Sequence, residues 1–193
     1  MAINLLDSVM DNLKGPVMDQ IGEWIGETPE KTKAATEGMV PSLLSGLIDM
    51  VSKPGGENQL SNVLKEADDS ILDKLGSLLR GGQAASTSQA GGNLLTSLFG
   101  DNMVTNLISG IAKFAGVNLG SAKSLLGLLA PVVFAAIKRL VSTRGLSLSW
   151  LVKFLLGQKD SIAKALPKGL AGLSFLGSAA TATGEEALAA LGD

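Results

Sequence analysis

The sequence predicts an all-α protein that is a tandem duplication of a small helical domain, with four to five helices in each copy. Two observations predict the helices. Apolar residues recur at spacings of three and four, and the apolar–polar alternation of a strand is never sustained. A third observation predicts the duplication, because residues 11–55 and 101–145 align without a gap at nine identical positions out of 45. Random pairing at ordinary residue frequencies gives about three identities.

Each copy is expected to contain one long helix with a proline inside it. In the first copy, Thr28 is a typical cap residue, Pro29 suits the first helical turn, and Pro54-Gly55-Gly56 ends the helix. The apolar face of this helix recurs with helical spacing at Met39, Val40, Leu43, Leu44, Leu47, Ile48 and Val51. Pro41 and its match Pro131 predict a kink or a break in each long helix.

Shorter helices are expected before and after each long helix. In the first copy they span residues 3–13, 17–26, 58–66 and 68–79, and in the second copy 92–99, 102–115, 147–157 and 159–166. The predicted domains are therefore a first copy at 1–80, a Gly/Ser/Ala-rich flexible linker at 81–92, a second copy at 93–169 and a small-residue tail at 170–193. A last short helix is expected at 185–191.

The composition excludes most catalytic and metal chemistry. The chain contains no Cys, His or Tyr, so it has no thiolate nucleophile, imidazole base, zinc finger or disulfide. Ser161 and Lys164 have the Ser-x-x-Lys spacing, but the accompanying Ser-Asp-Asn and Lys-Thr-Gly motifs are missing, and Ser161 is interpreted as a helix cap. The acidic segment Glu66-Ala67-Asp68-Asp69 is interpreted as a helix start rather than a cation site. We therefore expect no enzyme, no cofactor and no small-molecule substrate.

Charge is divided unevenly along the chain. Residues 1–82 carry 7 Lys/Arg and 13 Asp/Glu, whereas residues 83–169 carry 9 Lys/Arg and only two acidic residues. Several aligned positions have opposite charges: Glu23 and Lys113, Asp49 and Arg139, and Asp73 and Lys164. Three interpretations remain open, namely solvated faces without a role, contact between the acidic and basic copies, and nucleic-acid binding by the basic copy. The pI of about 5.2, the few aromatic residues and the absence of a helix-turn-helix signature disfavour nucleic acid.

The most apolar segment, Leu125–Ile137, is too short for a membrane span. Thirteen residues fall below the roughly 20 that a transmembrane helix needs, so a buried core helix is expected, with an inserting hairpin as the alternative. The N-terminal residues lack a basic leader, a long apolar run and a cleavage site, which predicts a cytoplasmic protein. Trp24 and Trp150 are interpreted as packing anchors.

Three segments of the first copy carry a family resemblance: Asn4-Leu5-Leu6, Ile21-Gly22-Glu23-Trp24-Ile25-Gly26 and Met39-Val40-Pro41-Ser42-Leu43-Leu44. These motifs resemble the bacterial domain of unknown function 937, to which the YidB-like proteins are similar. The resemblance extends over most of both copies. It implies an all-helical bacterial domain, with no established activity and no catalytic residues to transfer.

The function expected from these observations is a non-enzymatic, self-assembling structural protein. Copies or subunits would associate through apolar helix faces, oriented by Glu23, Asp49 and Asp73 of the acidic copy against Lys113, Arg139 and Lys164 of the basic copy. Head-to-tail contacts of this kind generate homo-oligomeric rings or filaments. The alternatives are a membrane-active helical bundle and a soluble adaptor for another protein.

Overall fold

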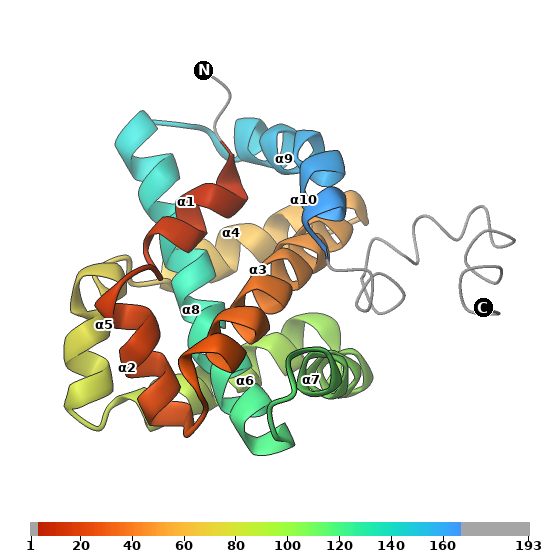
Figure 1. Cartoon of the computed structure of the whole chain (residues 1–193). Coiled ribbons are helices and arrows are strands. Elements are labelled where there is room, and N and C mark those ends of the chain that lie inside the picture. Colours follow the sequence, from red (N-terminus) through yellow and green to blue (C-terminus); the bar gives the residue numbers. More distant parts are fainter. Residues whose placement is uncertain (1–3, 167–193) are drawn as a thin grey trace, which may run out of the picture.

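Two long helices form the centre of the protein in the computed structural model, which describes residues 4–166. They are α3 (Pro29–Ser52) and α8 (Leu119–Arg144). Every residue from Gly38 to Ile48 of α3 is buried, and so is every residue of α8 from Leu125 to Ile137 except Pro131. A helix that is buried on all sides needs neighbours on all sides. The other helices provide them (Figure 1).

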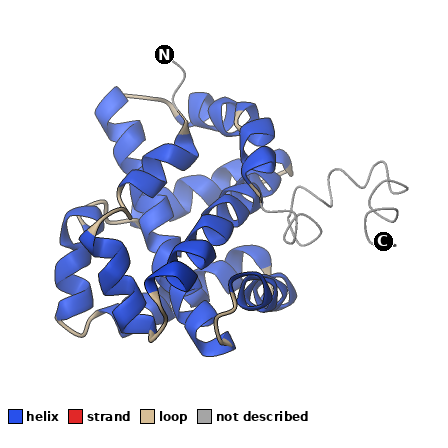
Figure 2. Ribbon diagram, in the orientation of Figure 1, coloured by secondary structure: helices blue, strands red, loops and turns tan. Residues whose placement is uncertain are grey.

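The described residues form helices joined by loops and contain no strand, as Figure 2 shows. In the first half α3 is accompanied by α1 (Leu5–Asp11), α2 (Pro16–Ile25), α4 (Gly56–Glu66) and α5 (Ile71–Arg80). In the second half α8 is accompanied by α6 (Ala84–Phe99), α7 (Asp101–Ala115), α9 (Leu148–Gly157) and α10 (Lys159–Ala165). The all-α prediction is confirmed, and each half contains five helices in the described part of the chain.

Both long helices continue through their internal prolines. Pro41 lies within α3 and Pro131 lies within α8, so the predicted long helices with a proline inside are confirmed, and neither proline breaks its helix. A proline removes one backbone hydrogen bond, but the packing of the neighbouring helices on α3 and α8 keeps both helices formed. Of the predicted kink or break, the break does not occur, because the packing around each long helix outweighs the local effect of its proline.

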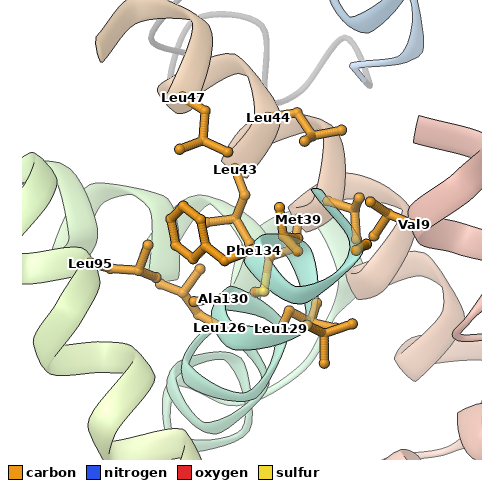
Figure 3. Packing of buried hydrophobic residues seen from close by; sticks show 14 of the residues in the cluster. Val9, Met39, Leu43, Leu44, Leu47, Leu95, Leu126, Leu129, Ala130 and Phe134 are labelled. Carbon is orange, nitrogen blue, oxygen red and sulfur yellow. The ribbon is translucent and has the colours of Figure 1, made fainter. Parts of the chain in front are cut away.

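The two halves share one core. Helices α7, α9 and α10 of the second half pack on α3, while α2, α4 and α5 of the first half pack on α8. A single cluster of buried hydrophobic residues contains members of both halves. Figure 3 shows Leu43 and Leu47 of α3 close to Ala130 and Phe134 of α8, with Leu95 of α6 alongside. The predicted domain boundary at 81–92 therefore does not separate two cores.

The flexible linker predicted at 81–92 is wrong, because most of this segment belongs to helix α6. Residues Ala84 to Phe99 form a helix, and its small residues Ala84, Ser88 and Gly91 are buried against α8. The Gly, Ser and Ala content, which was interpreted as flexibility, instead permits a close helix–helix approach. The predicted tail at 170–193 and the short helix at 185–191 lie outside the described residues.

Helix α8 is the one described helix that is long and apolar enough to cross a membrane by length and composition. Of the apolar window that meets this test, 67% is buried inside the protein. Residues 125–137 are therefore core residues in this structure, as the sequence predicts.

Candidate functional site

An open groove runs between α6, α7 and the first half of α8. Its volume is about 880 Å³. Hydroxyl and amide groups line the α6 side, including Gln89, Asn93 and Thr96. Helices α7 and α8 contribute apolar side chains together with polar and charged ones, Asp101 and Lys123 among them. Trp24 at the end of α2 and Leu119 at the start of α8 complete the lining. Hydrogen-bonding groups beside apolar surface are typical of a binding site.

One side of the groove is formed where α6 and α8 approach each other closely at a glycine. A Cβ atom on Gly127 would lie 2.0 Å from the Ser88 carbonyl oxygen, so the two backbones are in direct contact there. The Ser88 hydroxyl donates a hydrogen bond of 2.7 Å to the Ser124 carbonyl oxygen across the same contact. The groove therefore has a rigid wall on the α6–α8 side.

The connections α2–α3 and α7–α8 lie next to each other at one end of the groove. The Glu27 carboxylate accepts hydrogen bonds from the Asn118 backbone N–H at 3.1 Å and from its side-chain amide at 3.2 Å. The Ser121 hydroxyl donates to the Ile25 carbonyl oxygen at 2.8 Å. We call this surface, with Trp24, Phe114 and Leu119 around the two connections, the turn end.

The turn end is built by the same local signals twice. Gly26 and Gly116 end α2 and α7 with φ of 76° and 70°, a backbone region that favours glycine. The next helices begin with side-chain caps, in which Thr28 accepts from the Lys31 N–H and Asn118 accepts from the Ser121 N–H. Both connections are consequently short and ordered by hydrogen bonds.

Large apolar side chains are exposed at the turn end. Leu119 is 60% exposed and Phe114 is 41% exposed. The exposure of Leu119 and Phe114 is not predictable from the sequence, because both residues continue the apolar pattern of a helix. The groove residues of α6 are not predicted either, because residues 81–92 are expected to be a linker. The signal that identifies this helix is its buried face, in which Ala84, Ser88, Gly91 and Leu95 recur at helical spacing.

The structure brings together two of the six predicted contact residues, Asp73 and Arg139. The guanidinium of Arg139 on α8 lies 2.7 Å from the carboxylate of Asp73 on α5, and it also donates to the Asp69 carbonyl oxygen at 2.9 Å. The hydrogen bond to Asp73 raises the pKa of Arg139 above its already high usual value. Acidic-to-basic contact thus occurs inside the chain, between its first and second halves.

The other predicted contact residues do not pair as aligned. Asp49 forms a local ion pair of 2.8 Å with Lys53 instead of reaching Arg139. Glu23 and Lys113 are exposed on the last turns of α2 and α7, and Lys164 is exposed on α10. Within residues 4–166 none of these three forms an ion pair shorter than 4.0 Å.

The basic pair at the end of the apolar segment is also engaged inside the chain. The Lys138 ammonium donates to the Ala67 carbonyl oxygen, and Arg139 binds Asp69 and Asp73, so both residues hold the α4–α5 connection. Lys138 and Arg139 therefore form hydrogen bonds and ion pairs between the two halves of the chain. Arg144, the next basic residue of the basic copy, is exposed at the end of α8.

The motifs with catalytic or metal-binding spacing do not assemble into a site in the described residues. Ser161 lies inside α10, whose N-cap is Gln158, so its interpretation as the cap is wrong. No group of three acidic residues in the described part of the chain is placed to hold a metal ion. The Asp68 carboxylate accepts from the Ser70 hydroxyl at 2.6 Å and from its N–H at 3.0 Å, and these hydrogen bonds lower the pKa of Asp68.

A protein-family comparison matches residues 7–139, which cover more than half of the chain, to the bacterial proteins of unknown function called DUF937. The chain belongs to the DUF937 family. The matched region begins in α1, crosses the predicted linker and ends in α8, so the DUF937 match includes helices from both halves of the shared core. No curated protein and no solved structure matches the chain.

Proposed function

We propose that this DUF937 protein is a non-enzymatic structural protein that associates with copies of itself through the turn end. The observation that carries the proposal is the exposure of Leu119 and Phe114, at 60% and 41%, beside two unlike charges, Glu23 and Lys113. Exposed apolar patches rimmed by charges are typical of protein contact surfaces.

The positions of Glu23 and Lys113 suit a twofold contact. Each residue lies three positions before the glycine that ends its helix, Gly26 or Gly116, and the two connections that follow are joined by the hydrogen bonds of Glu27 to Asn118. In a twofold contact, residue i of one subunit meets residue j of the other, and the reverse also holds. The Glu23–Lys113 pair would then form twice, once in each direction between the two copies, and the apolar residues would be buried between the two pairs.

A second part of the proposal concerns the likeness of the two halves. We infer that they arose by tandem duplication of a five-helix unit, which the matching caps, glycines and internal prolines at an offset of 90 residues support. One chain would then be a pseudo-dimer whose halves are already joined by acidic-to-basic contact, as between Asp73 and Arg139. The turn end contains equivalent connections from both units.

A self-complementary turn end closes a dimer. A ring or a filament, the larger assemblies expected from the sequence, needs a second contact surface on each subunit. Lys164, exposed on α10, remains a candidate for such a surface.

Charge reversal with particle mass as the readout tests the proposal. In light scattering at low salt, we expect a mass above the 19.7 kDa of one chain, and we expect high salt to lower it. Glu23→Lys and Lys113→Glu should each reduce the mass to that of the monomer, and the double reversal should restore it. Lys65→Glu, a reversal at an exposed position of α4, is the control that should change nothing.

Two results would contradict the proposal in different ways. A mass of 19.7 kDa at every salt and protein concentration would exclude self-association. An oligomer that withstands both single reversals would exclude the Glu23–Lys113 pairing. Leu119→Ser then tests the apolar part of the contact, and because this residue is 60% exposed its replacement should leave the fold intact.

A further inference from the structure

We propose that the exposed face of α9 binds the surface of an anionic lipid membrane. This α9 face consists of Ser149, Trp150, Lys153, Leu156 and Gly157, with Phe154 at its margin. In Figure 1, α9 lies at the edge of the molecule opposite the connections of the turn end. The inference is therefore independent of the proposed self-association.

The apolar part of the α9 face is a pair of stacked rings and a leucine. The ring centroids of Trp150 and Phe154 are 4.9 Å apart with an interplanar angle of 14°. Trp150 is 38% exposed and Leu156 is 41% exposed. Tryptophan is suited to the boundary between water and lipid, because its ring is largely apolar and its N–H needs a polar partner. Trp150, which the sequence predicts to be a packing anchor, therefore also has an exposed side.

The polar part of the α9 face is basic. Between residues 140 and 159 the charged residues are Arg144, Lys153 and Lys159, and the first acidic residue after them is Asp160, exposed in the first turn of α10. Lys153 is exposed within α9, while Arg144 and Lys159 are exposed just before and just after it. Long basic side chains beside apolar groups bind anionic headgroups while their stems lie along the apolar surface. This charge complementarity favours an anionic membrane over a neutral one.

The fold does not require this exposed apolar surface. Helix α9 already buries Leu151 and Leu155 against its neighbours, so Trp150 and Leu156 are additional to its packing needs. Helix α4 has the same place in the helix order of the first half, and its exposed residues include Glu57, Gln59 and Asn62. An apolar and basic face at α9 thus distinguishes the second half from the first.

The contact that we propose is peripheral. It differs from the inserting hairpin that the sequence raised for Leu125–Ile137, because α8 stays in the core. Binding at an interface of this kind grows with the apolar area that enters the headgroup layer and with attraction to anionic lipid. Each basic residue near an anionic surface contributes a factor of about five to the partition constant.

Vesicle flotation of the full chain tests the charge requirement. We expect the protein to float with vesicles of phosphatidylcholine and phosphatidylglycerol and to stay at the bottom with phosphatidylcholine alone. Replacing Lys153 and Lys159 together by Gln should weaken binding roughly 30-fold, from two such factors. The matched control replaces Lys31 and Lys33 by Gln, which removes the same charge from the first turn of α3 and should leave binding unchanged.

The two tryptophans allow the contact face to be identified by fluorescence. Trp24→Phe leaves Trp150 as the only indole, and Trp150→Phe leaves Trp24. On anionic vesicles with brominated acyl chains, we expect Trp150 emission to shift to the blue and to be quenched, while Trp24 emission stays the same. Circular dichroism of each variant checks that the fold is retained.

Several results would overturn the inference. Absence of flotation with anionic vesicles would do so, as would equal loss of binding in the two Lys→Gln pairs. Quenching of Trp24 in place of Trp150 would place the contact elsewhere. A blue shift of Trp150 that depends on protein concentration without vesicles would show that another protein copy, not lipid, covers the α9 face.

Discussion

Gly91 of α6 and Gly127 of α8 meet so closely that a Cβ atom on Gly91 would lie 1.9 Å from the Gly127 carbonyl oxygen. The same added atom would lie 2.8 Å from the Pro131 ring. Because the two glycines allow this close approach, residues 84–92, which have the composition of a linker, pack on α8 as part of a core helix. The same α6–α8 contact forms one side of the groove that extends to the turn end.

We predict that Gly127→Ala destabilises the protein by roughly 3 kcal/mol, because the new methyl group meets Ser88 backbone atoms that cannot move alone. Gly92→Ala is the matched control on α6, where nothing lies within 4 Å of the added atom. It should stabilise the helix by about 0.5 to 1 kcal/mol. Urea denaturation of both variants measures the difference, and equal effects would refute the close packing.

We predict that Arg139 is energetically coupled to Asp73 and not to Asp49. The first pair is joined at 2.7 Å, whereas Asp49 pairs with Lys53. A double-mutant cycle with Arg139→Gln and Asp73→Asn should give a coupling of about 0.5 kcal/mol, because the pair is partly exposed. The cycle with Asp49→Asn should give a coupling near zero. Measurable coupling to Asp49 would instead support the aligned pairing predicted from the sequence.

We predict that both long helices depend on their side-chain caps. Thr28→Ala should cost about 1 kcal/mol of unfolding free energy, because the Lys31 N–H loses its acceptor. Asn118→Ala should cost roughly 0.5 kcal/mol more, because its amide also donates to Glu27 across the turn end. Thermal and urea unfolding measure both costs. A larger loss for Thr28→Ala would contradict the role of the Glu27 contact.

We predict a pH effect at Asp68. The Ser70 hydroxyl and N–H lower its pKa in the folded protein, so the ionised carboxylate favours folding. This contribution is complete above the unfolded pKa of about 3.9 and is lost as pH falls through the lower folded value. Ser70→Ala should raise the pKa of Asp68 in an NMR titration. Ser86→Ala, which removes a hydroxyl bound to the Gln83 carbonyl oxygen, should leave this pKa unchanged.

The helices and their ends are the part of this fold that local sequence predicts well. Pro29 after Thr28, and the glycines at 26, 116 and 145, act within one helical turn, so the predicted bounds lie close to the observed ones. The candidate site was predicted less well. Glu23 and Lys113 are exposed at the turn end, but Leu119 and the groove residues of α6 were missed. The exposure of a side chain depends on which neighbours cover it, and the periodicity of apolar residues in the sequence does not show which neighbours these are.

The sequence by itself therefore determined the all-α class, the two long helices, the Thr28 cap of the first of them and the exclusion of Cys and His chemistry. These properties depend on residue type and on spacings of a few residues. Only the tertiary structure decided that the 84–99 segment is a core helix, that Arg139 pairs with Asp73, and that one face of Trp150 is left uncovered. Each of these depends on contacts between residues far apart in the chain. Such contacts are set by how whole helices pack, with the first half lying on α8 and the second half on α3.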